Sequence, residues 1–263
     1  MFAISIVLLS LVLVLNGQSP TAAEGTRKGP NAVDVPNCDR AQFRLLLDVG
    51  HTAEAFGATS ARNVPEYDFN LRLATEIDQS LIDAGFTKTV LLITHGPKMS
   101  SLLERVTVAN QISANLFLSI HHDSVPDAFL QDWEYDGSAS HFSDRFAGYS
   151  LFLSYENHYL SASIVFGKLL GTQLKDRGLQ YDRHYTKEFM GRYQHQLVDA
   201  NVGLYRYDQL VVLRETKMAA VLLEAGSIIN RNEEILMNSP ERRALIGGAV
   251  TRAVEKFCEA RSF

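Results

Sequence analysis

Three polar residues stand directly after short apolar runs of the sequence, and their types suit metal chemistry. They are His51, His121 and Glu224. One histidine at the end of a strand is more often a hydrogen-bonded structural residue than a ligand. Two histidines with a further carboxylate form a donor set that catalytic zinc takes in proteins, with a fourth position left for water. The sequence therefore indicates a zinc site built from residues far apart along the chain.

The sequence offers two candidates for the carboxylate ligand. Glu54 completes a His51-x-x-Glu54 pattern that resembles the His-x-x-Glu pair of zinc carboxypeptidases, which take a distant histidine as their third ligand. Glu66 lies farther along the chain, where a long amphipathic helix over 67–84 is expected to begin. The residue types by themselves leave both candidates open.

The elements that must bring these residues together alternate between short apolar runs and amphipathic stretches. The runs predict strands buried on both faces, at 43–49, 89–94, 116–120 and 220–224, with 149–154 and 210–213 as further candidates. Helices are expected over 67–84, 99–113, 162–177 and 240–260. This order predicts an α/β fold, a single domain with a mostly parallel or mixed twisted sheet flanked by helices, of phosphorylase/hydrolase-like type. Ligand sites of such sheets form at the carboxyl ends of the strands, where the three polar residues stand.

Four local motifs resemble, in order and spacing, those of the zinc-dependent N-acetylmuramoyl-L-alanine amidases of the Amidase_3 type. The first is Asp-x-Gly-His followed by Gly-Ala, the second Glu-x-Asp-x-Asn-Leu, the third Ser-Ile-His-x-Asp, and the fourth Glu-x-Gly with an asparagine shortly after. They stand at 48–58, 66–71, 119–123 and 223–230, and the resemblance extends from about residue 43 to residue 255. Val49 replaces the family's proline and Thr52-Ala53 replaces its Gly-Gly pair, departures that affect loop shape rather than ligands.

The resemblance implies a complete active site and a reaction. It gives His51, Glu66 and His121 as the ligands of a Zn²⁺ cofactor, and it puts Glu54 on a variable loop position. It gives Glu224 as the catalytic carboxylate, which would accept a proton from water and protonate the departing amine. The implied reaction is hydrolysis of the amide bond between N-acetylmuramic acid and L-alanine in peptidoglycan.

Two other functions are consistent with the same residues. The first is a zinc carboxypeptidase or another peptidoglycan peptidase that uses Glu54 with the two histidines. The second is a wall-binding protein that has kept the fold and lost catalysis, although all four site residues are present. For Glu224, the alternative role is a structural carboxylate in a salt bridge with Arg62 or Arg214.

Several neighbouring residues carry separate expectations. Asp48 either orients a ligand imidazole or caps local backbone amides. His122 should point away from the metal because successive side chains of a strand alternate in direction, and Asp123 should shape the turn or contact substrate. His184 and His195 are the remaining histidines that could add a ligand, and we do not expect either to do so.

Two aromatic-rich segments lengthen the chain relative to a minimal family member, at 125–148 and 179–201. We expect that they wall the substrate groove, that one forms a lid, or that they only pack on the surface. Some family members carry a helix that blocks the zinc site until a partner removes it, and the connection 156–161 is too short for such a helix. An activator or a divisome protein is nevertheless a candidate partner beside the peptidoglycan substrate.

The ends of the chain indicate export. The apolar run 2–15 followed by small residues at 21–23 is typical of a secretory signal peptide, and it is shorter than the roughly 20 residues that span a bilayer. We therefore expect a signal peptide at 1–23, a lead-in at 24–40 and the catalytic domain at 41–263, secreted to the periplasm or cell envelope with no stable membrane insertion after cleavage. Cys38 and Cys258 are the only two cysteines and form a disulfide candidate. A net charge of -5 disfavours a nucleic-acid partner.

Overall fold

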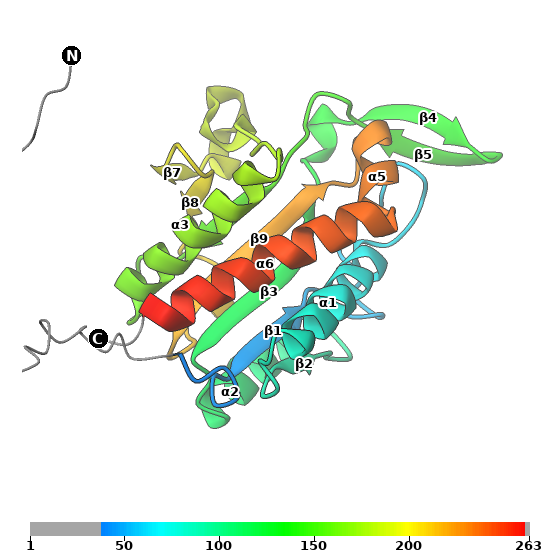
Figure 1. Cartoon of the computed structure of the whole chain (residues 1–263). Coiled ribbons are helices and arrows are strands. Elements are labelled where there is room, and N and C mark those ends of the chain that lie inside the picture. Colours follow the sequence, from blue (N-terminus) through cyan, green and yellow to red (C-terminus); the bar gives the residue numbers. More distant parts are fainter. Residues whose placement is uncertain (1–37, 261–263) are drawn as a thin grey trace, which may run out of the picture. The chain divides into compact units, whose positions relative to one another are not determined.

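A seven-stranded mixed sheet forms the centre of the protein in the computed structural model, which describes residues 38–260 (Figure 1). The expected signal peptide at 1–23 and most of the expected lead-in lie outside the described residues. The order of strands across the sheet is β2-β1-β3-β9-β6-β8-β7. Their bounds are Leu45–Val49 for β1, Val90–Leu92 for β2, Leu116–Asp123 for β3, Ser150–Leu153 for β6, Gln196–Asp199 for β7, Leu204–Arg206 for β8 and Ala219–Ser227 for β9.

The four strands β2, β1, β3 and β9 run parallel to one another, and β6 then joins β9 in the antiparallel direction. The carboxyl ends of β1, β3 and β9 therefore meet at one end of the sheet, as the sequence predicts. The register makes His121 of β3 the partner of Glu224 of β9. Two of the three polar residues that follow apolar runs are thus neighbours across a strand pair.

Helices cover both faces of the sheet. Their bounds are Glu66–Asp83 for α1, Lys98–Gln111 for α2, Leu160–Asp176 for α3, Val211–Arg214 for α4, Arg231–Met237 for α5 and Pro240–Ala260 for α6. One face is covered by α1, α3 and α6, with α6 lying between the other two (Figure 1). The other face is covered by α2 and α4. This is the α/β single-domain fold expected from the sequence.

The apolar stripe of α1 shows why these residues form a helix against the sheet. Phe69, Leu73, Ile77 and Leu81 recur at four-residue steps and are all buried in the core. Acidic residues in the first turn stabilise the helix, because its amino-terminal end carries a partial positive charge. Glu66 is the first residue of α1, so the packing of the stripe on the sheet fixes where its carboxylate lies.

One expected strand is wrong. The segment 210–213 forms the short helix α4, not a strand, and the adjacent strand is β8. Val212 and Leu213 are buried on the α2 side of the sheet. A run of four apolar residues can be buried as a strand or as one helical turn, and periodicity cannot separate the two over so short a length.

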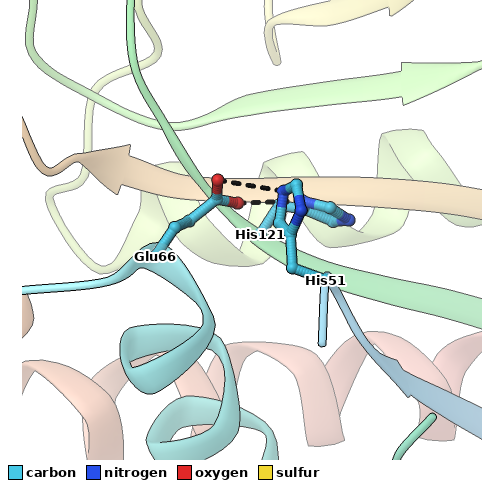
Figure 2. Close-up of side chains that lie close together, drawn as sticks. All are labelled: His51, Glu66 and His121. Atoms are coloured by element: carbon cyan, nitrogen blue, oxygen red, sulfur yellow. Dashed lines mark hydrogen bonds and ion pairs between the residues drawn. The ribbon is translucent and has the colours of Figure 1, made fainter. Parts of the chain in front are cut away.

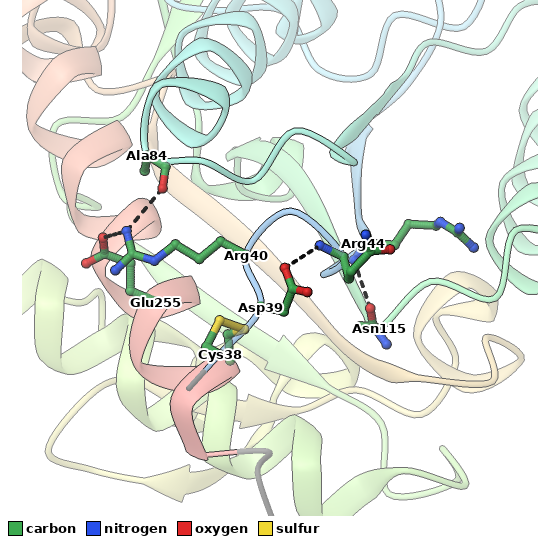
Figure 3. Close-up of a disulfide and its surroundings, with 9 residues drawn as sticks. Cys38, Asp39, Arg40, Arg44, Ala84, Asn115 and Glu255 are labelled. Atoms are coloured by element: carbon green, nitrogen blue, oxygen red, sulfur yellow. Dashed lines mark hydrogen bonds and ion pairs between the residues drawn. A yellow bond between two sulfur atoms is a disulfide. The ribbon is translucent and has the colours of Figure 1, made fainter. Parts of the chain in front are cut away.

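The expected disulfide between Cys38 and Cys258 is present (Figure 3). It joins the start of the described chain to the last turns of α6, across 220 residues of sequence. Arg40 lies beside it, 2.7 Å from the carboxylate of Glu255 and donating to the carbonyl oxygen of Ala84 (Figure 3). Among residues 38–260, every helix is too short or too polar to cross a bilayer.

Candidate active site

His51, Glu66 and His121 come together at the carboxyl end of the sheet (Figure 2). His51 follows β1, His121 lies in β3 and Glu66 begins α1. The Glu66 carboxylate lies between the two imidazoles, with Oε2 3.0 Å from Nε2 of His51 and Oε1 3.0 Å from Nδ1 of His121. One potential ligand atom from each residue lies within 4.8 Å of the others, so this group could hold a metal ion.

Further hydrogen bonds fix the Glu66 carboxylate. The Asn70 side chain, one helical turn later, donates to Glu66 Oε1 and to the carbonyl oxygen of Gly50. The backbone N–H of Ala58 donates to Oε2. Burial raises the pKa of Glu66, but the hydrogen bonds and charges of His121 and His51 outweigh burial and hold that pKa well below its usual range. The group is therefore ionised, as a metal ligand must be.

Two glycines make room for the side chains of His51, Glu66 and His121, because a glycine has no β-carbon. A β-carbon at Gly50 would overlap the His121 ring, and one at Gly57 would overlap both the Glu66 carboxylate and the His51 ring. Gly57 also has a φ of +80°, which side chains rarely tolerate. The Gly-x-x-x-x-x-x-Gly spacing between them is thus a steric requirement of the site.

The two adjacent histidines of β3 have different surroundings. Burial lowers the pKa of His121, which favours the neutral imidazole that binds metals. Burial lowers the pKa of His122 further, to about 3. His122 points to the α1 face, where its Nδ1 lies 2.8 Å from Oδ1 of Asn70. The expectation that His122 points away from the metal group is confirmed.

A buried arginine holds the loop that carries His51. The Arg105 guanidinium of α2 lies 2.8 Å from Oδ1 of Asp48 through Nε, and it donates to the backbone carbonyls of Val49 and His51. Ser119 donates to the other oxygen of Asp48 at 2.6 Å. His51 has a φ of +69°, an uncommon conformation for a residue with a side chain. Asp48 therefore acts through Arg105, a residue that the sequence analysis did not single out.

Glu224 has none of the partners that Glu66 has. Its Oε2 is buried without a hydrogen-bond partner in the described part of the chain. Burial, followed by the nearby Asp123 and Glu66 charges, raises the pKa of Glu224 well above its usual range. Arg62 pairs with Glu234, and Arg214 lies near Glu156 and Glu215, so neither arginine is the salt-bridge partner that the alternative role requires.

Asp123 is the carboxyl group that accompanies Glu224. It is buried, and its Oδ1 accepts a hydrogen bond of 2.8 Å from the Tyr185 hydroxyl. Burial raises the pKa of Asp123 to about 7, against the opposing effects of His184 and Tyr185. Its backbone carbonyl also accepts from the N–H of Ile228, so Asp123 shapes the turn as expected and reaches the site as well.

A pocket of about 400 Å³ opens beside His51, His121 and Glu224, on the α2 face of the sheet. One side, the α2 wall, consists of Lys98, Met99 and Leu102. The other side, the tyrosine wall, consists of Tyr185, Tyr207 and Phe152. Phe152 packs edge-on against Tyr185 and Tyr207, at ring distances of 5.1 and 5.8 Å.

The two aromatic-rich segments differ in their relation to this pocket. The segment 179–201 supplies Tyr185 to the tyrosine wall, which agrees with the expectation of a groove wall. The segment 125–148 forms a hairpin of β4 (Gln131–Tyr135) and β5 (Ser138–Phe142) that projects from the sheet (Figure 1). Its Trp133 and Phe142 rings lie under the Arg62 and Arg231 side chains, away from the pocket.

The remaining candidates lie outside the metal group. Glu54 accepts a hydrogen bond from the N–H of Gly96 and is exposed. His184 pairs with Asp182 at 3.0 Å in the interior. His195 stacks against Tyr207, at a ring distance of 4.3 Å. The geometry thus favours Glu66 over Glu54 as the carboxylate of the metal group, and His184 and His195 lie outside that group.

Sequence comparison identifies relatives along most of the chain. A family model described as N-acetylmuramoyl-L-alanine amidase (Amidase_3) matches residues 45–256. The N-acetylmuramoyl-L-alanine amidase AmiA of Salmonella typhimurium is 25% identical, over 92% of this chain and 86% of its own. A putative N-acetylmuramoyl-L-alanine amidase of Buchnera aphidicola is 21% identical, over 81% of this chain and 95% of its own.

Solved structures share the fold. The amidase Ami1 of Mycobacterium smegmatis superposes with a TM-score of 0.64 at 19% identity, covering 86% of this chain and 100% of that one. The catalytic domain of the amidase CwlV of Bacillus (Paenibacillus) polymyxa has a TM-score of 0.58 at 24% identity, covering 82% and 97%. At these identities the likeness concerns the arrangement of sheet and helices.

Proposed function

Because the chain belongs to the Amidase_3 family of N-acetylmuramoyl-L-alanine amidases, we propose that His51, Glu66 and His121 bind the zinc ion with which it cleaves peptidoglycan. We further propose Glu224 as its catalytic carboxylate. The observation that carries the proposal is the contrast within one site. A carboxylate that contacts two imidazoles stands beside a second carboxylate whose buried oxygen has no hydrogen-bond partner among residues 38–260.

The donor set fits zinc. Two imidazole nitrogens and one carboxylate oxygen are ligands that zinc takes in hydrolases, and they suit it better than magnesium or calcium, which prefer oxygen donors. The lowered pKa of His121 and the ionised Glu66 give both residues the protonation states that metal binding requires. When bound, zinc supplies Lewis acidity to an amide carbonyl and to water.

Glu224 moves the proton in this proposal. It lies across from His121 in the strand register and lines the pocket in which the amide would lie. Its carboxylate accepts a proton from the attacking water and passes it to the nitrogen of L-alanine as the C–N bond breaks. Burial raises the pKa of Glu224, which favours the protonated state that donates to the departing nitrogen.

Metal analysis of the purified protein together with product identification on isolated cell walls tests the proposal. We expect one zinc per chain, and products consisting of intact stem peptides with a free L-alanine amino group and glycan with free lactyl carboxyl groups. Release of amino acids from the carboxyl ends of the stems would instead indicate a carboxypeptidase. A protein that binds cell walls without zinc and without releasing either product would indicate the inactive wall-binding alternative.

The cellular setting that we propose is the envelope. Amidase action on peptidoglycan requires a position outside the cytoplasmic membrane, and the sequence at 1–23 has the pattern of an exported protein. Amino-terminal sequencing of the mature protein tests cleavage at that position, and a start at Met1 would contradict it. A partner is a further possibility for this fold, because the CwlD amidase of Clostridioides difficile is known in complex with the GerS lipoprotein.

A further inference from the structure

The two walls of the pocket differ in charge. Two carboxyl groups accompany the tyrosine wall: Glu224, which itself lines the pocket, and Asp123, which accepts a hydrogen bond from Tyr185. The α2 wall carries Lys98, which is exposed and has no acidic partner within residues 38–260. The first turn of α2 contains no acidic residue that would neutralise it. An anionic substrate group is therefore attracted to the α2 wall.

Three further polar residues that line the pocket near α2 already have partners. Arg105, the second cation of the lining, is paired with Asp48. Ser119 donates to Asp48, and Ser101 is hydrogen-bonded to Thr94. Val212 and Leu222 add apolar lining beside Met99 and Leu102 of the α2 wall. The α2 side of the pocket thus combines an apolar surface with one positive charge, that of Lys98.

The stem peptide of peptidoglycan has this chemistry on one side of the scissile bond. L-alanine contributes a methyl group, and the second residue is a glutamate whose α-carboxyl group is either free or amidated. Two residues extend over about 7 Å, and Lys98 lines the same pocket as Glu224. The sugar on the other side of the bond carries no comparable charge once its lactyl group is in amide linkage.

We propose that the stem peptide lies along the α2 wall and that Lys98 binds the free α-carboxylate of its second residue. Lys98 is then a specificity-determining residue that distinguishes acidic from amidated stems. The inference rests on the proposed amidase function and adds the direction of the substrate across the site.

Two small substrates separate the possibilities: N-acetylmuramoyl-L-alanyl-D-glutamate and its amidated form, N-acetylmuramoyl-L-alanyl-D-isoglutamine. For the wild type we expect kcat/KM about 3- to 10-fold higher for the acid, mainly through KM. In Lys98→Met the ratio should fall to about one, in Lys98→Glu it should invert, and in Lys98→Arg it should be retained. Lys217→Met is the matched control, because Lys217 is exposed just before β9, at the opposite end of that strand from Glu224.

Binding provides a second measurement. In full-length Glu224→Gln protein, calorimetric dissociation constants should show the same preference for the acid and lose it when Lys98→Met is added. Equal kcat/KM for both substrates in the wild type, or an unchanged ratio in Lys98→Met, overturns the inference. If the wild type releases the L-alanyl dipeptide from neither compound, the proposed function fails rather than the role of Lys98.

Discussion

Glu66 and Glu224 are two glutamates at the same end of one sheet, and their surroundings give them opposite properties. Burial raises the pKa of Glu66, but the hydrogen bonds and charges of the two imidazoles outweigh burial and keep that pKa well below the usual range. Glu224 has a buried oxygen without a hydrogen-bond partner in the part of the chain that the structure describes. Burial and the charge of Asp123 keep the pKa of Glu224 well above that range. Environments that separate two pKa values in this way separate a ligand from an acid–base group. The groups that surround each glutamate, rather than its residue type, therefore determine which one is a metal ligand and which one transfers protons.

Replacing Glu66 should have the largest effect on metal binding, because it removes the negative charge that contacts both His51 and His121. We expect Glu66→Gln to weaken zinc binding by more than about 100-fold, the upper figure for losing a supporting residue of a metal site, and to abolish cell-wall hydrolysis. Zinc affinity is measured by competition with a chelator. Glu54→Gln is the matched control, since Glu54 is exposed and outside the metal group, and an equal loss there would reverse the assignment.

Replacing Glu224 should affect the reaction without affecting the metal. We expect Glu224→Gln to lower kcat by about 10²–10⁴, the usual contribution of a general acid–base group, while the zinc content stays at that of the wild type. Steady-state kinetics with metal analysis on the same sample measures both. Loss of zinc in this variant would make Glu224 a ligand and remove the contrast with Glu66.

Asp48 is a third buried carboxylate, and Arg105 and Ser119 contact its two oxygens. In Arg105→Leu its charge is left without a partner, so we expect the free energy of unfolding of the metal-free protein to fall by about 3–5 kcal/mol. Urea denaturation measures this, and adding Asp48→Asn should recover part of the loss. Arg252→Leu, at an exposed pair with Glu255, should cost less than about 1 kcal/mol. A similar small cost for Arg105→Leu would show that the buried pair does not hold the His51 loop.

The smallest expected effect concerns pH. Asp123 raises the pKa of Glu224 through its negative charge, so Asp123→Asn should lower that pKa. The carboxylate form of Glu224 then persists to lower pH, and the ascending limb of the kcat/KM profile should shift toward acid. Asp132→Asn on the exposed hairpin should leave the profile in place. A shift toward higher pH in Asp123→Asn would contradict the electrostatic reason for the raised pKa.

Much of the site could be predicted because it follows from strand ends. Parallel strands place their carboxyl ends together, so His51, His121 and Glu224 had to meet once the apolar runs were identified. Glu66 was chosen over Glu54 through the helix motif of the resemblance, and the packing of the α1 stripe is the physical reason for its position. The alternation of side chains along β3 was sufficient to exclude His122.

Other features depend on contacts that no local pattern shows. Arg105 looks like an ordinary residue of an amphipathic helix, and only its burial beside Asp48 shows its role. Tyr185 and Trp133 belong to equally aromatic segments, yet one lines the pocket and the other packs on an arginine. The mistaken strand at 210–213 has the same origin, because tertiary packing decides the conformation of so short an apolar run.

The link between Cys38 and Cys258 also affects how the enzyme would withstand a protease. The exposed turn of the β4–β5 hairpin, at Asp136 and Gly137, is a natural cleavage point. A single cut there would place His51, Glu66 and His121 on one fragment and Glu224 on the other. Each fragment would retain one half-cystine, so the halves of the active site would remain one covalent molecule, separating on a gel only after reduction.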